Sequence, residues 1–267
     1  MSGATDLHPA RFLAACAAKR LGRTVVLFDR VASTNAVAME AASVGAPEGL
    51  LVVAETQTAG RGRKGRSWLS TPGKSLVFSL LLRPPAGRDG LTALFGLAAA
   101  RALDPFAGDI AIKWPNDLFR RGRKLGGILA EAGGGAAVVG MGVNVNEDAG
   151  DFPASIARRA ISLRMASGAE HDRLAVLARV IESFERLYGR WRREGFPSVR
   201  PELESRLLYL GKRVVVETGE DSVRGNMAGV TAEGYLRLLV EGKERVFASG
   251  DLSLRRSPHA VVAAKKR

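Results

Sequence analysis

Sulfur and imidazole side chains are scarce in this chain of 267 residues. Cys16 is the only cysteine, so an intrachain disulfide and zinc sites built from several cysteines are excluded. The three histidines, His8, His171 and His259, lie near a terminus or at the start of a predicted helix. We therefore expect no catalysis by histidine or cysteine. A lone cysteine also fits a reducing, cytoplasmic location.

Long apolar runs are lacking as well. A membrane-spanning helix needs roughly 18 consecutive apolar residues, and the longest apolar run, at about 91–100, is bracketed by charge. The segment 12–18 is followed directly by Lys19 and Arg20 without a convincing cleavage site, so we interpret it as a short N-terminal helix and not as a signal peptide. We expect no part of the chain to cross a membrane.

Acidic residues are too few to balance the basic ones. The chain has 40 Lys and Arg against 27 Asp and Glu, a net charge of +13. Such a balance suits a nucleic acid or an acidic protein as partner. The basic clusters are spread over 61–66, 120–124, 158–159, 190–193 and 265–267. This spread is typical of a solvated surface, so composition does not choose the partner.

Alternating strand and helix patterns predict an α+β fold, a mixed β-sheet flanked by helices. Strands are expected at 24–28, 50–54, 75–82, 110–114, 128–132 and 136–145, and helices at 35–43, 90–103 and 172–191. Beyond Gly211, short strands at 213–217, 222–230, 235–240 and 245–248 predict a small β-barrel. The predicted division is an N-terminal extension at 1–22, a large domain at 23–205, the barrel at 206–256 and a disordered basic tail at 257–267.

Residues 60–66 combine glycines with cations. Glycine frees the backbone to turn and to bring N–H donors close to a ligand. Arginine forks match carboxylate and phosphate oxygens. The segment contains Gly60, Arg61, Gly62, Arg63, Lys64, Gly65 and Arg66, and Trp68 follows. It predicts an anion-binding loop, although RNA-binding segments and solvated loops share this composition.

Four further motifs accompany this loop. They are Ser33-Thr34-Asn35, Lys113-Trp114-Pro115-Asn116-Asp117, the run from Lys124 to Glu131 and the run from Gly140 to Asn146. Together with the loop they resemble the biotin protein ligases from about Val25 to Arg255. The resemblance implies a class II synthetase-like catalytic domain for biotin and ATP, followed by an SH3-like barrel. It implies a ligase that makes biotinyl-5'-AMP and transfers biotin to a lysine of a biotin carboxyl carrier domain.

The resemblance also assigns individual residues. It places biotin against Ser33, Thr34, Asn35, Gln57, Gly60, Arg61, Arg63, Lys113, Leu125, Gly126 and Gly127, with Lys124 beside them. It places the nucleotide against Arg63, Arg66, Trp68, Lys113 and Asn144, with Lys113 and Arg63 in catalytic roles. Simpler roles exist for several of them: Ser33 or Thr34 can cap a helix, Lys113 can be an exposed strand end, and Trp68 can be a core anchor.

Joining a carboxylic acid to ATP brings two anions together, so cations must converge at the site. A charge pair at about 4 Å gains roughly 4 kcal/mol at an effective dielectric of 20, against about 1 kcal/mol in water. We therefore expect the 60–66 loop to close over the ligands as a lid that excludes water. Mg²⁺ is the expected cofactor, with Asn144 as its first candidate ligand and Asp117 as a second.

Only about 22 residues precede the first predicted strand, whereas many bacterial relatives carry an N-terminal helix-turn-helix domain. We therefore expect a monofunctional ligase that does not bind DNA. Its expected partner is the carrier domain of acetyl-CoA carboxylase or a related carboxylase, and a homodimer is left open. Two alternatives remain, a lipoate or octanoate ligase or transferase of related fold and a non-enzymatic RNA-binding protein.

Overall fold

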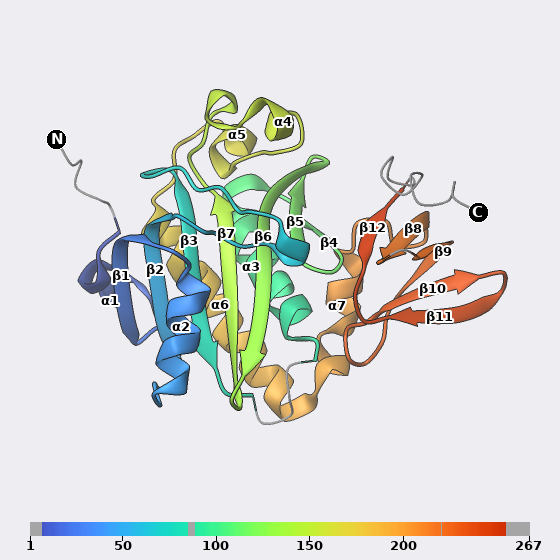
Figure 1. The fold of residues 1–267 in the computed structure, drawn as a ribbon, viewed down its shortest axis with the longest axis horizontal. Coiled ribbons are helices and arrows are strands. Elements are labelled where there is room, and N and C mark those ends of the chain that lie inside the picture. Colours follow the sequence, from blue (N-terminus) through green and yellow to red (C-terminus); the bar gives the residue numbers. More distant parts are fainter. Residues whose placement is uncertain (1–6, 85–88, 220, 255–267) are drawn as a thin grey trace, which may run out of the picture.

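The computed structural model describes residues 7–84, 89–219 and 221–254. Within these ranges the chain forms a large mixed sheet with helices on both faces and a smaller antiparallel sheet beside it (Figure 1). The predicted fold class is thereby confirmed. None of the described helices is both long and apolar enough to cross a membrane.

The large sheet has seven strands among the described residues, in the order β1-β2-β3-β7-β6-β5-β4. Strands β1 and β2 are parallel, and every other neighbouring pair is antiparallel. The strands are β1 (Thr24–Val31), β2 (Leu50–Gln57), β3 (Ser75–Leu82), β4 (Ala111–Lys113), β5 (Asp117–Arg120), β6 (Arg123–Gly133) and β7 (Ala136–Asn144). The short β4–β5 hairpin was not foreseen, because one strand was expected there.

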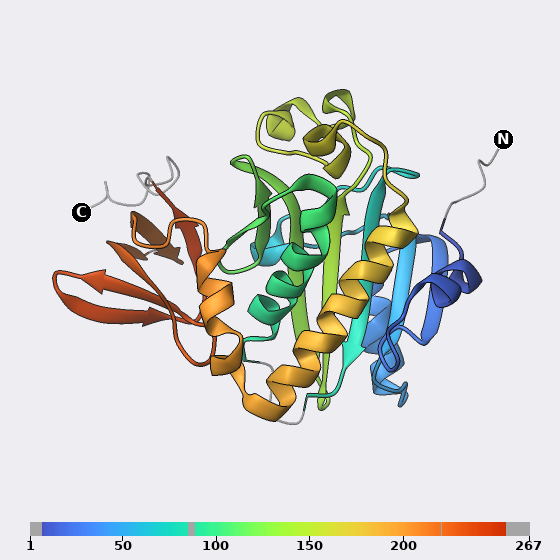
Figure 2. The ribbon, with the colours of Figure 1, turned by 180° about the vertical axis from the view of Figure 1, so that it is seen from behind.

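Helices cover the two faces unequally. Helix α2 (Thr34–Ser43) lies on one face, while α3 (Leu91–Ala107) and α6 (Arg173–Glu194) lie side by side on the other (Figures 1 and 2). The remaining helices are α1 (Pro9–Ala15), α4 (Ala154–Ala157), α5 (Leu163–Ser167) and α7 (Arg200–Ser205), with 3₁₀ turns at Arg63–Gly65, Ala149–Asp151 and Phe196–Ser198. The N-terminal segment is a helix as predicted.

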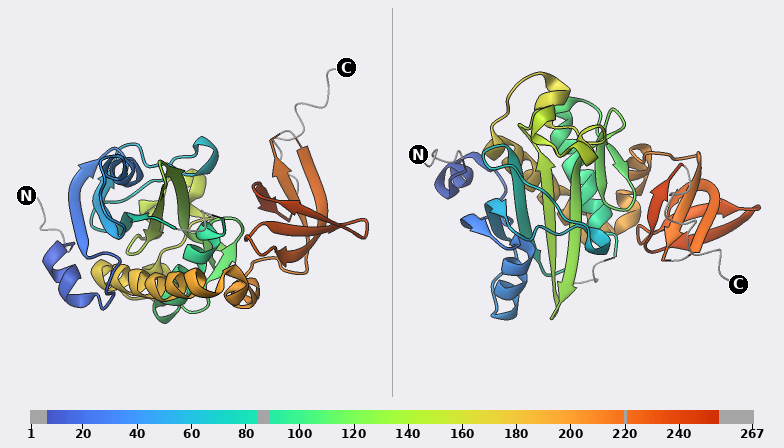
Figure 3. Two further views of the ribbon diagram at one scale, coloured as in Figure 1. Left: turned by 90° about the horizontal axis from the view of Figure 1, so that it is seen from below. Right: turned by 45° about the horizontal axis from the view of Figure 1, so that its top comes forward.

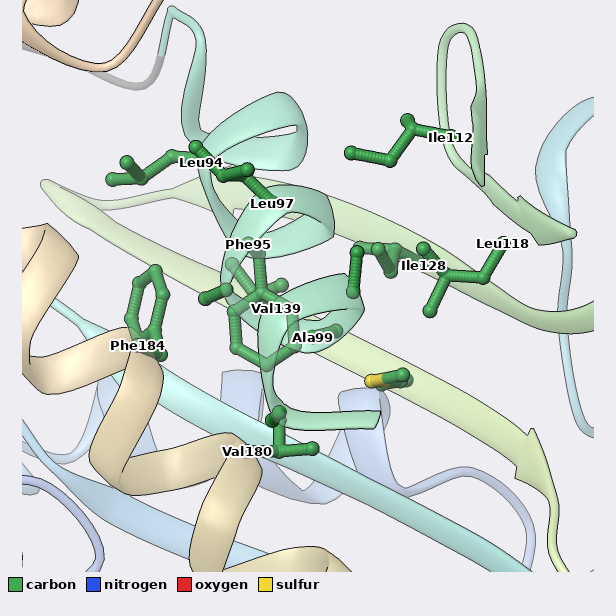
Figure 4. Close-up of a cluster of buried hydrophobic side chains, with 14 of the residues drawn as sticks. Leu94, Phe95, Leu97, Ala99, Ile112, Leu118, Ile128, Val139, Val180 and Phe184 are labelled. Atoms are coloured by element: carbon green, nitrogen blue, oxygen red, sulfur yellow. The ribbon is translucent and has the colours of Figure 1, made fainter. Parts of the chain in front are cut away.

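The apolar side of α6 forms much of the core. The predicted stripe of Leu174, Leu177, Ile181, Phe184, Tyr188 and Trp191 is buried throughout. The helix begins after Asp172, whose carboxylate accepts from the Leu174 amide at 2.8 Å. Phe184 packs on Phe95 of α3, with ring centroids 4.6 Å apart (Figure 4). Burying each such side chain stabilises the fold by about 1.5–3 kcal/mol, which fixes both helices against the sheet.

The smaller sheet follows α7, beside the end of the large sheet that carries β4 (Figure 3). Its order is β11-β10-β9-β8-β12, and all pairs are antiparallel. The strands are β8 (Arg213–Thr218), β9 (Asp221–Val230), β10 (Leu236–Val240), β11 (Lys243–Phe247) and β12 (Asp251–Ser253). Over 213–219 and 221–254, no pairing of β11 with β12 closes this sheet into a barrel.

The two sheets are joined by direct contacts. The indole Nε1 of Trp114 donates to the carbonyl of Gly234 at 3.3 Å. Phe196 packs so closely on Gly90 that a β-carbon there would meet its ring at 2.7 Å. The predicted boundary at 205/206 falls between the end of α7 and the start of β8, and the domain limits stay a prediction. The expected tail at 257–267 lies outside the described residues.

Candidate functional site

A pocket of about 120 Å³ opens on the face of the large sheet that carries α2. Its walls come from the start of α2, the end of β2, the glycine and arginine loop, and strands β5, β6 and β7. Of the predicted site residues, those that line it are Ser33, Thr34, Asn35, Gln57, Arg61, Arg63, Arg66, Trp68 and Gly127. Lys124 and Asp117 line it too. The structure thus brings most of the separated motifs to one cavity.

The start of α2 supplies a buried polar cluster. The Thr34 amide and hydroxyl both donate to Oε1 of Gln57, at 2.8 and 3.1 Å. The Asn35 amide nitrogen donates to Oε2 of Glu131 at 2.7 Å, and its Oδ1 lies 2.6 Å from the hydroxyl of Ser79. These bonds fix the amide and hydroxyl groups before any ligand arrives. Sequence reasoning missed Ser79, because one serine in an apolar strand carries no distinctive signal.

Ser33 caps a helix and also lines the pocket, so the capping role leaves its predicted contact with biotin open. Its hydroxyl accepts from the Ala36 amide as the N-cap of α2, at 3.4 Å. The same residue is 5% exposed and lines the pocket. Capping therefore holds Ser33 in place at the pocket wall.

Two glycines of β7 leave room for side chains that pack directly against the backbone of this strand. A β-carbon at Gly140 would lie 2.1 Å from Oδ1 of Asn35, and one at Gly142 would lie 2.2 Å from Cε2 of Trp68. Only glycine permits these approaches. Both residues line the pocket. Both belong to the predicted motif at 140–146. Glycines at alternate positions of one strand could have revealed that this face of β7 is closely approached, but the prediction did not use that pattern.

Trp68 is half-buried on the pocket wall. Its indole Nε1 is buried and has no hydrogen-bond partner among residues 7–84, 89–219 and 221–254. The ammonium of Lys124 lies 5.7 Å from the ring centroid. An unpaired buried donor costs about 1–3 kcal/mol. Trp68 therefore offers a flat ring and an unused donor to whatever enters the pocket.

Lys124, and not Lys113, is the lysine at the pocket wall. Its Nζ pairs with Oδ1 of Asp117 at 2.7 Å, and both residues line the cavity. Lys113 is opposite Asp117 in the β4–β5 hairpin, and its ammonium lies 5.5 Å from the Phe119 ring centroid, outside the lining. Burial lowers the pKa of Lys113, although Asp117 opposes the shift. Lys113 is also close enough to Lys124, Asp251 and Arg66 to interact with their charges. It therefore lies beside the pocket, and its contacts with biotin and nucleotide stay a prediction.

Arg63 faces the pocket from the glycine and arginine loop. Its Nη1 donates to the carbonyl of Gly250 at 3.2 Å. Burial lowers the pKa of Arg63, although Asp251 opposes the shift. The loop and the smaller sheet therefore meet at the pocket mouth.

The other cations of this loop are neutralised by carboxylates. Arg61 pairs with Glu131 of β6 at 3.2 Å. Lys64 and Arg66 share Asp251 of β12, at 3.2 and 3.0 Å. Exposed pairs of this kind stabilise by only about 0–1 kcal/mol each, so a bound anion can replace them.

Three more predicted residues determine how the chain packs around the site. A β-carbon at Gly60 would lie 2.6 Å from the carbonyl of Trp68, and one at Gly126 would lie 2.8 Å from the carbonyl of Gly142. Leu125 is fully buried in the core. None of these three lines the pocket. They shape the chain around the site, and direct contact with biotin stays a prediction for them.

Asn144 also lies outside the pocket lining. Its amide nitrogen donates to the carbonyls of Ile161 and Lys124, at 3.0 and 3.5 Å. These bonds tie β7 to β6 and to the segment after α4. Among the described residues no group of three or more His, Cys, Asp and Glu could hold a metal ion. The geometry of Asn144 therefore lends no support to its predicted nucleotide and magnesium contacts.

Comparisons with known proteins agree with this arrangement. The model of the Biotin/lipoate A/B protein ligase family matches residues 27–148, and that of the Biotin protein ligase C terminal domain matches 209–255. The chain is 36% identical over 244 residues to the bifunctional ligase/repressor BirA of Bacillus subtilis, covering 88% of this chain and 75% of that protein. It is 34% identical over 240 residues to the biotin--[acetyl-CoA-carboxylase] ligase of Mycobacterium tuberculosis, covering 86% of this chain and 88% of that one.

A solved structure shows the same likeness. The biotin protein ligase from Aquifex aeolicus in complex with biotin and ATP superposes with a TM-score of 0.78 at 32% identity. The match covers 88% of this chain and all of that one. The likeness therefore includes both sheets.

Proposed function

The chain belongs to the biotin protein ligase family, and from this premise we propose that it joins biotin to ATP as biotinyl-5'-AMP and transfers biotin to a lysine of a carrier domain. One observation carries the proposal. A single pocket unites a preformed polar cluster, a lysine, three arginines and a tryptophan from separate parts of the chain.

The polar cluster suits the ureido ring of biotin. That ring presents one carbonyl acceptor and two N–H donors, and Ser33, Thr34, Asn35 and Gln57 supply both donors and acceptors. Phe78, Ile128 and Met141 also line the pocket. They offer apolar surface to the ring carbons and the valeryl chain.

Lys124 stands beside Lys113, the lysine first predicted to meet the reacting anions. Its ammonium is held at 2.7 Å by Asp117 and lines the cavity. A compact charge there can reach the biotin carboxylate and the α-phosphate together. In the first step a carboxylate oxygen attacks the α-phosphorus, a C–O–P linkage forms, and pyrophosphate leaves. Lys124 and Arg63 offset the repulsion between the two anions.

Trp68 and the loop arginines suit the nucleotide. The indole provides a stacking surface for the purine, and its unpaired Nε1 provides a donor. Phosphate oxygens can replace Asp251 on Arg66 and Glu131 on Arg61, because both pairs are exposed. The loop would thereby close as the predicted lid.

Magnesium would enter with the phosphates of ATP, where it neutralises charge. Asp117 is a carboxylate of the pocket wall and is the residue we expect to hold it. Mg²⁺ tolerates few protein ligands, so one carboxylate is chemically adequate.

In the second step the neutral amine of a carrier lysine attacks the carbonyl of the mixed anhydride. An amide bond forms, and AMP leaves with the bonding electron pair. The net charge of +13 favours an acidic carrier domain as partner. We propose a carboxylase carrier as the acceptor and the cytoplasm as the location, where Cys16 stays reduced. A DNA-binding role is not part of the proposal, and a homodimer stays open.

A transfer assay tests this function. The protein is incubated with ATP, Mg²⁺, labelled biotin and a biotin carboxyl carrier domain, with labelled lipoate in a parallel reaction. Biotin is expected on one lysine of the carrier, and lipoate on none. Transfer of lipoate alone would favour the lipoate ligase alternative. RNA binding without transfer would favour the non-enzymatic one.

A further inference from the structure

Helices α3 and α6 lie side by side on the face of the sheet opposite α2 (Figure 2). Residues of both helices line a basic groove there. Its volume is about 470 Å³. Its polar lining consists of Arg101, Arg179, Arg186, Arg190, Glu182 and Ser183. Four cations therefore face one carboxylate, far from charge balance. The proposed ligase reaction does not use this face.

The spacing along α6 explains the convergence. Arg179, Ser183, Arg186 and Arg190 are separated by four, three and four residues, so they share one side of the helix. Arg186 and Arg190 are like charges one turn apart, an arrangement that disfavours the helix. Arg101 joins them from α3. The groove therefore concentrates positive charge, although repulsion between Arg186 and Arg190 destabilises the helix locally.

Two of the four arginines in the groove are neutralised, whereas the other two are not. Arg101 pairs with Glu202 at 2.7 Å, and Arg190 pairs with Glu194 at 3.3 Å. Within the described ranges Arg186 makes no ion pair, and Arg179 only lies 5.7 Å from the Phe106 ring centroid. The guanidinium groups of Arg179 and Arg186 are thus available to an anion.

The carboxylate in the groove is already engaged. Oε1 of Glu182 accepts the amide of Ala17 at 2.7 Å. This hydrogen bond comes from the N-terminal segment and satisfies one oxygen of the carboxylate. Glu182 is therefore held toward that segment, and among the described residues it makes no ion pair with Arg179 or Arg186.

Ser183 is an independent indication of a ligand. The residue is 4% exposed and lines the groove. In the described parts of the chain no acceptor or donor pairs with its hydroxyl, although serine in a helix commonly bonds back to the preceding turn. Its oxygen is not among the fully buried atoms that lack a partner, so it reaches the space of the groove and is open to an oxygen ligand between Arg179 and Arg186.

We propose that this groove is a second anion site, which binds a small ligand with two or three linked phosphates. Arg179 and Arg186 are seven residues apart, about 10 Å along the helix, which matches a short oligophosphate and exceeds a single phosphate. The volume is in the usual range for small-ligand sites.

Titration calorimetry with inorganic tripolyphosphate tests the site on the full chain. Arg186→Gln is expected to weaken binding by about tenfold, and Ser183→Ala by about threefold, as loss of a charged and a neutral hydrogen bond predicts. The matched control is Arg193→Gln, an exposed arginine of α6 outside the groove. Lys124→Ala, in the other pocket, reports binding there. Arg193→Gln is expected to stay within about twofold of the wild type. Lys124→Ala is expected to weaken only a binding step that belongs to the pocket and to leave the step at the groove in place.

Each contrary outcome has a distinct meaning. Equal losses in Arg186→Gln and Arg193→Gln would reduce the site to general surface charge and overturn the proposal. Loss in Lys124→Ala alone would move the binding to the other pocket and overturn it too. Single-stranded RNA that binds through Arg186 where tripolyphosphate does not would make the groove a nucleic-acid surface instead. None of these outcomes depends on biotin transfer.

Discussion

Arg66 of the pocket loop pairs with Asp251 of β12, 185 positions later in the sequence, with Nη2 and Oδ1 3.0 Å apart. Lys64 reaches the same carboxylate at 3.2 Å. Burial works against ionisation of Asp251, but Lys64 and Arg66 outweigh it and lower the pKa of that carboxyl. Two ion pairs thus attach the loop to the smaller sheet.

Asp251→Asn should loosen the loop without unfolding the protein, because exposed ion pairs contribute about 0–1 kcal/mol each. Trypsin should then cut within 61–66 faster, and biotin with ATP should restore protection. The matched control is Glu244→Gln, which removes the Arg237 pair of the same sheet, 2.6 Å long, away from the loop. Equal cleavage rates in Asp251→Asn and the wild type would show that this carboxylate does not restrain the loop.

The carboxylate pair also predicts a pH dependence. A lowered pKa in the folded state means that Asp251 contributes stability above the carboxyl's ordinary pKa, and this contribution is lost as pH falls through the folded value. The unfolding free energies of wild type and Asp251→Asn should therefore differ at neutral pH and converge on acidification below about pH 4. A difference in unfolding free energy that persists in strong acid would contradict an ionic origin of the contact between the loop and Asp251.

Lys124→Ala should lower adenylate formation by about 100-fold or more, the usual cost of removing a charge that stabilises the transition state. Lys113→Ala should lower it as well, because the ammonium of Lys113 interacts with the charges of Asp117 and Lys124 beside the pocket. Biotin-dependent ATP–pyrophosphate exchange measures both variants. Exchange at the wild-type rate in either variant would remove that lysine from the proposed role.

Gly142→Ala should expel the Trp68 indole from β7, since the new methyl group would lie 2.2 Å from Cε2. Nucleotide affinity should fall by about tenfold, the scale of a lost stacking contact, and tryptophan fluorescence should change. Gly150→Ala is the control, because nothing lies within 4 Å of its added β-carbon. Unchanged ATP affinity in a folded Gly142→Ala protein would remove Trp68 from the nucleotide site.

Arg173→Met should destabilise the fold by about 3–5 kcal/mol, because it leaves a buried carboxylate unpaired. The guanidinium is 1% exposed and bonds Glu55 at 2.7 and 2.9 Å and the Ser75 carbonyl at 2.9 Å. Urea unfolding measures the loss. Adding Glu55→Gln should recover part of it, and a double variant no better than the single one would argue against an unpaired charge as the cause.

The periodic parts of the fold were predictable from sequence. The stripe of α6 from Leu174 to Trp191 repeats every three or four residues, and helical spacing alone places it in the core. The motif at 33–35 was equally accessible, since capping and ligand chemistry use the same residue types. Local pattern carries this information because each element buries its own apolar side.

The pairing of Lys124 with Asp117 was not accessible from sequence. It depends on the register between β5 and β6, which brings the two side chains to the pocket wall. The role of Asp251 depends on a contact across 185 residues. Such contacts arise from how two sheets pack, which no short stretch of sequence encodes.

Native mass spectrometry tests the central claim most directly, that separated cations meet around one biotin and nucleotide anhydride. After incubation with biotin, ATP and Mg²⁺, the protein should retain the mass of one biotinyl-5'-AMP, and Lys124→Ala should retain none. A wild-type protein that gains no such mass, or gains it equally in the Lys124→Ala variant, would contradict the account.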